Sequence, residues 1–416
     1  MTCADLAVPL ASSEAAVTPN TRKTLSPRLA FYLQASMTTS FLAGSSAPTP
    51  LYRIYQAAWG FSPIMITLIF GIYAIAVLGS LLVAGRLSDF VGRRRVLFFA
   101  ALGQIAAIAI FATADGVNAL LVARVLQGLA AGAAVAAVGA GLLDLDKQRG
   151  TIANAIAPLL GTGLGGVIGG LFVHFLPAPT HLVYVFLGAV FVLQAIGVAR
   201  MADTVAPRAG ALKSLKPQFN LPVAVREPLL LTVPVLIAAW SLGGFYASLG
   251  PTLVRSLAGS ESVLLGGLAI FVLAVTGAIA VLAMHNQAAR TMMSVGAGLL
   301  VLGVAVSLAA VAWHALGLFF IGTAIAGAGF GPSFQGAVRM VVPLAGPRER
   351  AGVLAIVFVI SYLALGVPAI GAGWLVAHTG NIAATARDFG VTVMLLATLA
   401  LIGTQARWPI EAVAAR

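Results

Sequence analysis

Apolar runs of about 20 residues recur along the whole chain, and a helix of that length crosses the roughly 30 Å hydrocarbon core of a bilayer. The runs are continuous rather than alternating, which predicts helices and excludes a β-barrel. Only 9% of the 416 residues are charged, whereas a soluble protein carries about a quarter. We count twelve runs, at about 29–52, 63–84, 96–113, 117–143, 151–175, 181–199, 229–254, 263–284, 292–313, 316–342, 352–377 and 389–406. The sequence therefore predicts an all-α polytopic membrane protein with twelve transmembrane helices in two six-helix halves.

Polar segments divide this series of runs. Residues 200–228 hold four prolines and five basic residues and predict a linker. This linker separates an N-terminal half at 28–199 from a C-terminal half at 229–416. Residues 1–27 are polar and lack an apolar core, which indicates a disordered tail rather than a signal peptide.

The net charge of +12 is spread over short loops rather than gathered on one surface, which excludes a nucleic-acid partner. On the twelve-run topology, 20 of the 24 Lys and Arg residues fall on one side of the membrane, 3 on the other, and Arg124 inside a run. Positively charged loops stay in the cytoplasm, so we expect both termini there, in a multi-pass protein of a bacterial inner (plasma) membrane. With one cysteine, Cys3, the chain has no disulfide framework, and we expect no metal site.

A block of unusual charge density, Gly85-Arg-Leu-Ser-Asp89-Phe-Val-Gly92-Arg93-Arg94-Arg95, joins the second and third runs. Its glycines permit a tight turn, Asp89 can complement the positive end of a helix, and the arginines can pair with carboxylates. The alternative interpretation is a loop that serves membrane topology alone.

The spacing of Gly85, Asp89, Gly92 and Arg93 resembles the signature loop of the major facilitator superfamily, and the resemblance covers all twelve runs. It implies that the block, Arg94 included, is a conformational latch on the cytoplasmic side. Asp89 would face the start of the eleventh helix near Arg350, and Arg93 would meet Asp144 at the end of the fourth.

Arg124-Val-Leu-Gln127-Gly128-Leu-Ala-Ala-Gly132 resembles the helix 4 signature of the same family. A charge inside a membrane helix requires a partner or a water-filled cavity. We favour a role for Arg124 in binding an anionic group or in coupling, over an arginine that reaches outward to Asp115. The stretch also aligns, at an offset of 199, with Thr323 to Gly331 of the tenth run, which predicts a repeat of the two halves.

Glycines repeat at four-residue spacing in the fifth run, and such stripes let helices pack closely. The positions are Gly161, Gly165 and Gly169, with Gly166 and Gly170 beside them. The stripe partly resembles the helix 5 signature of the family's antiporters, although its proline is absent here.

Candidate solute contacts are polar or aromatic groups in otherwise apolar runs, and helix packing is the alternative for each of them. They are Gln34, Thr38, Tyr73, Gln127, Trp240, Tyr246, Gln335 and Tyr362. Pro48 and Pro50 in one half, and Gly250-Pro251 in the other, mark matching bending points.

The resemblance implies a monomeric secondary transporter that moves a small organic solute, a drug or metabolite, by alternating access. We expect export in exchange for protons, with no enzyme activity and no bound cofactor, since the sequence has no phosphate-binding loop. None of the twelve acidic residues falls in a run, so proton coupling is implied by the family, with His174 and His378 as the remaining titratable candidates. Uptake of a nutrient and a non-transporting membrane sensor are the alternatives.

Overall fold

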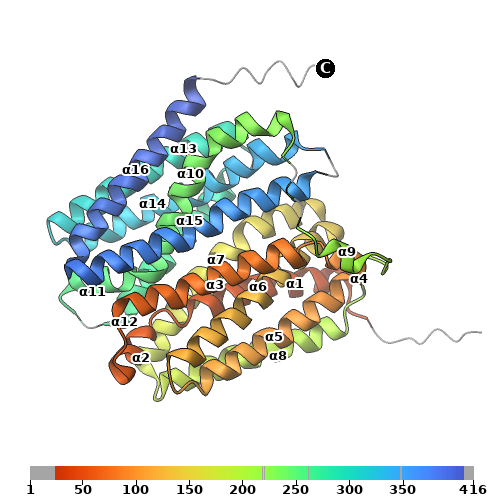
Figure 1. Ribbon diagram of the computed structural model, residues 1–416, viewed down its shortest axis with the longest axis horizontal. Coiled ribbons are helices and arrows are strands. Elements are labelled where there is room, and N and C mark those ends of the chain that lie inside the picture. The colour runs from red at the N-terminus through yellow and green to blue at the C-terminus, as the bar shows by residue number, and fades with distance from the viewer. Residues whose placement is uncertain (1–23, 218, 220, 261, 347–348, 407–416) are drawn as a thin grey trace, which may run out of the picture.

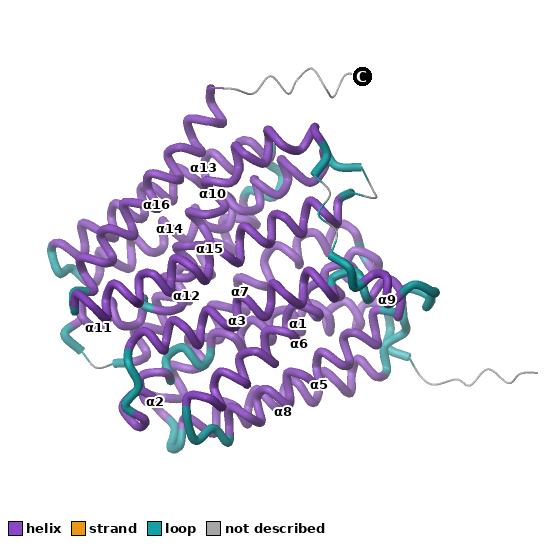
Figure 2. The backbone as a smooth tube through the Cα atoms, viewed as in Figure 1, coloured by secondary structure: helices purple, strands orange, loops and turns teal. Residues whose placement is uncertain are grey.

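The computed structural model describes residues 24–406 except 218, 220, 261 and 347–348, and all regular structure in this part is helical (Figure 2). The predicted disordered tail falls mostly on residues 1–23, outside the described residues. The elements are α1 (Pro27–Ser46), α2 (Tyr52–Trp59), α3 (Pro63–Ala84), α4 (Ser88–Val91), α5 (Arg93–Ala112), α6 (Val117–Leu145), α7 (Lys147–Phe175), α8 (Pro179–Ala199), α9 (Ala211–Ser214), α10 (Val223–Ser248), α11 (Gly250–Ala258), α12 (Val263–Ala283), α13 (Ala289–Ala312), α14 (Leu316–Val341), the 3-10 turn η1 (Val342–Leu344), α15 (Arg350–Thr379) and α16 (Ile382–Ala406).

Eleven helices in the described part are long and apolar enough to cross a membrane. The first predicted span, α1, is not among them because Gln34 and several Ser and Thr residues reduce its apolarity. α1 nevertheless packs lengthwise among α6, α7 and α8. Counted with the eleven other helices, it brings the number of spans to the predicted twelve. Protein rather than lipid surrounds much of its polar surface, which is why a span of this composition is tolerated.

Several boundaries differ from the prediction by a few residues, and two of them concern the linker and the last span. The linker was expected to reach residue 228, but α10 begins at Val223, directly after Pro222. The last span was expected to begin at 389, but α16 begins at Ile382, so Asp388 lies in a helix and not in a loop. Arg387 and Asp388 lie exposed in the second turn of this helix and pair with each other at 3.1 Å, so their charges do not interrupt it.

The described residues form two large hydrophobic clusters, one from Ala30 to Met201 and the other from Val225 to Ala400. In Figure 1 the corresponding helices lie as two groups, red to yellow and green to blue. Contacts between the groups run along α3 with α15 and along α7 with α12. The bundle has a linker end, with α4 and α9, and a far end, with α2 and α11 (Figure 1).

The two halves repeat each other in detail. α2 ends at Gly60 and α11 at Gly259, both glycines in the left-handed conformation (φ 65° and 55°), where a Cβ would be unfavourable. A Cβ added at Gly128 of α6 would meet Ala76 of α3, and one at Gly327 of α14 would meet Thr276 of α12. The offset of 199 seen in the sequence therefore relates equivalent helix contacts.

Candidate functional site

The break after α1 leaves backbone carbonyls that another helix must satisfy. In an uninterrupted helix the N–H of residue 48 would donate to the carbonyl of Gly44, but residue 48 is proline and has no N–H. The side-chain amide of Gln127 donates to the Gly44 carbonyl instead, at 3.0 Å. Arg124 Nη1 donates to the next carbonyl, that of Ser45, at 2.7 Å. The bend predicted at Pro48 and Pro50 thus creates the acceptors that the two polar residues of α6 use.

The Arg124 guanidinium is completely buried (0% exposed). Its Nε donates to the Tyr52 hydroxyl at 2.5 Å and its Nη1 also donates to Gln127 Oε1 at 2.7 Å. The rings of Tyr52, Tyr73 and Phe111 lie 5.3–5.5 Å from its Cζ, a distance at which a cation is attracted to an aromatic face. The carboxyl-terminal end of α1 adds a negative dipole end.

Arg124 forms no ion pair with a carboxylate among the residues that the structure describes. Its guanidinium points at Ser45, Tyr52 and Gln127, so the alternative of an arginine reaching outward to Asp115 does not describe this side chain. Neutral oxygens, rings and a helix end stabilise the charge without cancelling it, and the site keeps a net positive charge that can attract an anionic group.

The equivalent position of the C-terminal half has no charge. Thr323 stands where Arg124 stands in the repeat, and its hydroxyl lies 2.8 Å from the hydroxyl of Tyr246. Tyr246 stacks on Phe319, with ring centroids 6.0 Å apart. The two halves therefore each place a polar contact between equivalent helices. The contact in the N-terminal half carries a positive charge, and the contact in the C-terminal half is neutral.

Aromatic side chains continue from Arg124 into the other half. Tyr362 of α15 packs against the N-terminal hydrophobic cluster, to which Tyr73 of α3 belongs. The Trp240 ring lies 5.0 Å from Tyr362 and 5.3 Å from Phe334. Arg124, Tyr73, Tyr362 and Trp240 thus form a connected series across the boundary between the halves, and all four were candidates from sequence.

Two hydrogen-bond donors in this series are buried and have no partner among the described residues: Arg124 Nη2 and Trp240 Nε1. Buried donors are normally satisfied, and leaving one unsatisfied costs about 1–3 kcal/mol. Groups of this kind are candidates for binding an acceptor atom of a solute.

A cavity of about 170 Å³ lies between the halves at the far end. Its wall includes Thr49, Tyr52 and Gln56 from one half, and Ser248 and Thr252 from the other. Tyr52 also accepts the hydrogen bond from Arg124, so this side chain contacts both the cavity and the buried charge.

Besides Tyr246, whose partners are Thr323 and Phe319, three candidates lie apart from this series. Gln34 is buried against Gly141, and its amide contacts the sulfur of Met201, which places it in the packing of the N-terminal half near the linker end. Thr38 is buried and Gln335 half-buried. The structure does not join these three to the Arg124 series.

The charged loop forms a compact cluster around Arg93, whose side chain is 7% exposed. Arg93 Nε donates to Asp144 at 3.2 Å, which is the predicted ion pair, and its Nη1 donates to Ser88 at 2.6 Å and to Asp89. Asp89 was predicted to contact the start of α15, but among the described residues its ion pair is with Arg93 of the same loop. The tight turn at Gly92 brings Asp89 and Arg93 together inside the loop, and this local pairing uses the carboxylate.

The glycines of α7 serve two different helices. Side chains at Gly161, Gly165 and Gly169 would overlap backbone carbonyls of α1, whereas Gly166 and Gly170 face Gly267 and Leu264 of α12. One stripe therefore allows packing inside the N-terminal half and the other allows contact between the halves.

Tyr52, Ser45 and Phe111 surround Arg124 but were not among the candidates. Tyr52 stood at the end of an apolar run, where an aromatic residue usually indicates a membrane interface. The available signal was the pair Pro48 and Pro50, since a helix that breaks there must present free carbonyls to the nearest donor.

The fold and this site define a multi-pass helical membrane protein whose two six-helix halves meet around a buried cation and aromatic side chains. The sequence model of the Major Facilitator Superfamily matches residues 34–287, about three fifths of the chain, and the chain belongs to that superfamily of transporters.

Among curated proteins, the chain is similar to the cephamycin export protein CmcT of Amycolatopsis lactamdurans, with 32% identity over 174 residues, or 39% of this chain. The match spans about a third (34%) of that protein. Among solved structures, the human organic anion transporter MFSD10 (TETRAN) has a TM-score of 0.65 at 16% identity, over 90% of this chain and 100% of that one. A variant of the nucleoside transporter NupG has a TM-score of 0.65 at 12% identity, over 91% and 98%. At these identities the two structures bear on the fold alone.

Proposed function

We propose that the protein is a secondary transporter that moves a small organic solute between its two halves by alternating access, and that it exports this solute in exchange for protons. The observation that supports the proposal most is the connected series Arg124, Tyr73, Tyr362 and Trp240. A solute held there touches both halves, and rocking of one half against the other would expose it to each side of the membrane in turn.

The chemistry of the series favours a solute with an aromatic or apolar body and hydrogen-bond acceptors. The rings of Tyr73, Tyr362 and Trp240 offer apolar faces, and Arg124 Nη2 and Trp240 Nε1 offer free donors. Because the charge of Arg124 is not cancelled by a described carboxylate, a weakly anionic group on the solute would gain both a charge interaction and hydrogen bonds.

Export is supported by the similarity to a protein named for cephamycin export. Proton exchange rests on the family resemblance. The candidate titratable groups His174 and His378 are exposed near the ends of α7 and α15, a position suited to proton entry rather than to the solute route. Coupling is therefore the part of the proposal that needs direct measurement.

We place the linker end in the cytoplasm of a bacterial cell, because the arginines of α5 and the linker lie at that end. The native Cys3, the sole cysteine, tests this without any substitution. A membrane-impermeant maleimide should label it in inverted membrane vesicles and not in intact cells; labelling of intact cells would reverse the assignment.

The function is tested first in a strain that lacks its main efflux pumps. Expression of the protein should raise resistance to amphipathic, weakly anionic compounds, and the purified protein in liposomes should move the same compounds. Flux should respond to an imposed pH gradient if protons are exchanged. Accumulation of these compounds in the cells instead of resistance would establish uptake. If no compound crosses the liposome membrane, the non-transporting sensor becomes the favoured alternative.

A further inference from the structure

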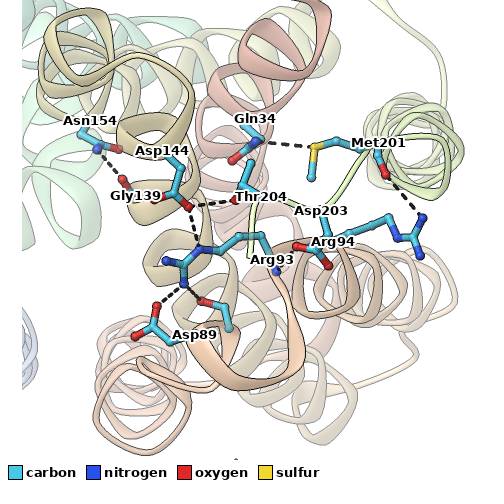
Figure 3. A network of polar contacts seen from close by, with 11 residues as sticks. Gln34, Asp89, Arg93, Arg94, Gly139, Asp144, Asn154, Met201, Asp203 and Thr204 are labelled. Atoms are coloured by element: carbon cyan, nitrogen blue, oxygen red, sulfur yellow. Dashed lines mark hydrogen bonds and ion pairs between the residues drawn. The ribbon is translucent and has the colours of Figure 1, made fainter. Parts of the chain in front are cut away.

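The helix that follows the charged loop begins without a cap of its own. α5 starts at Arg93, directly after Gly92, whose backbone has φ 99° and supplies no side chain. The first N–H groups of a helix need external acceptors. The acceptor here comes from more than 100 residues away: the Asp203 carboxylate accepts from the Arg93 N–H at 2.7 Å and from the Arg94 N–H at 3.5 Å (Figure 3).

Gly92 is required for this contact as well as for the turn. A Cβ at position 92 would overlap the Asp203 carboxylate. The loop signature therefore leaves a space that a residue of the central linker occupies. A carboxylate at this place also complements the positive end of the helix dipole.

The next linker residue joins the ion pair of the loop. The Thr204 hydroxyl donates to Asp144 Oδ2 at 2.8 Å, and this is the same oxygen that accepts from Arg93 Nε at 3.2 Å (Figure 3). The Met201 carbonyl accepts from Arg94 Nη1 at 3.5 Å. Linker and loop thus share one polar network, in which Asp144 connects them.

The linker also contacts the other side of the loop. The Arg208 N–H donates to the Phe90 carbonyl at 2.8 Å, and its guanidinium lies 4.5 Å from the centre of the Phe90 ring. Residues 201–204 hold α5 and residues 208–210 hold α4, so this stretch of the linker spans the turn at Gly92 from one helix to the other.

We propose that linker residues 201–210 act as a clamp on the charged loop, with Asp203 as a positioning residue that keeps Arg93 between Asp89 and Asp144. The inference rests on the proposed function in so far as the clamp affects transport. Asp203 and Thr204 lie at the linker end, whereas the solute route lies around Arg124. Loss of the clamp should therefore slow turnover and leave solute affinity unchanged.

The test compares Asp203→Ala with Asp203→Asn, because asparagine caps a helix about as well as aspartate and alanine does not. Leu212→Ala is the matched control: Leu212 is in the same linker, 83% exposed, and leaves every trypsin site intact. Trypsin cleavage after Arg208 in purified full-length protein reports whether the linker is docked. Flux in liposomes reports KM and kcat.

Asp203→Ala should be cleaved about fivefold faster and turn over about fivefold more slowly with the same KM, and Asp203→Asn should restore both values. Leu212→Ala should behave as wild type. Cleavage of Asp203→Ala at the wild-type rate would overturn the clamp, whether or not any solute is transported.

Faster cleavage with normal turnover would overturn the positioning role, and failure of asparagine to restore the values would exclude capping as the cause. A wild-type protein that moves no solute would count against the proposed function alone, since the cleavage measurement does not depend on it.

Discussion

At the scale of the residue, Arg124 is stabilised by groups that remain neutral. Its partners are a hydroxyl, a backbone carbonyl, an amide and three aromatic rings. A carboxylate paired with a buried arginine would neutralise its positive charge, and the arginine would then attract an anionic solute less strongly. The neutral surroundings hold the guanidinium in one place, do not neutralise its charge and leave Nη2 without a hydrogen-bond partner among the described residues.

Tyr52→Phe should destabilise the protein, because Arg124 Nε loses its acceptor in a buried site, at a cost of about 1–3 kcal/mol. Tyr55→Phe is the matched control: its hydroxyl pairs with that of Tyr184 at 3.2 Å, a contact between neutral groups. Unfolding midpoints of the purified variants should fall further for Tyr52→Phe. Equal midpoints would mean that Tyr52 does not stabilise Arg124.

Trp240→Phe should weaken solute binding, because it removes the free indole N–H and keeps an aromatic ring beside Tyr362 and Phe334. We expect the Kd for an acceptor-bearing solute to rise about tenfold, which corresponds to about 1.4 kcal/mol. Trp374→Phe, at a residue that is 51% exposed, should bind as wild type does. Unchanged binding by Trp240→Phe would remove the indole from the site.

At the scale of the element, α7 packs closely against both halves, because its glycines face α1 on one side and α12 on the other. The helix packs so closely that backbone carbonyls occupy the places of absent side chains. Since α12 belongs to the other half, the same helix supports the N-terminal core and forms part of the surface along which the two halves meet.

Gly165→Ala should lower the yield of monodisperse protein, since the added Cβ would overlap the Ala43 carbonyl and Ser46 Oγ, and a backbone carbonyl cannot rotate away. Gly371→Ala is the control, because nothing lies within 4 Å of a Cβ there. Alanine at an open helical position should even stabilise the helix by up to about 1 kcal/mol. Comparable profiles of the two variants in size-exclusion chromatography would contradict the close packing of α7.

At the scale of the whole molecule, the Arg93–Asp144 pair was implied by the family resemblance, and the sequence itself predicted features that rest on residue pattern: the apolar spans, the repeat and the glycine stripes. Hydrophobic length and residue spacing carry this information directly. The described contacts between Gly128 and α3, and between Gly327 and α12, follow the same offset that the sequence displays.

Features that depend on long-range placement were missed. Tyr52 meets Arg124 because α1 breaks at Pro48 and Pro50, and no spacing rule gives the direction of the chain after such a break. Asp203 caps a helix that begins at Arg93, over a separation that no local pattern records. Asp89 was expected to reach α15, but a closer cation inside its own loop takes its carboxylate.

We propose that the solute passes Arg124 between the two halves, and flux in liposomes measures whether it does. Arg124→Gln removes the buried charge, and Arg149→Gln makes the same change at a side chain that is 70% exposed. With a solute that the wild-type protein transports, we predict that kcat/KM falls at least about tenfold for Arg124→Gln, or about 1.4 kcal/mol of lost stabilisation, and stays at the wild-type value for Arg149→Gln. Wild-type flux by a correctly inserted Arg124→Gln variant would contradict the account.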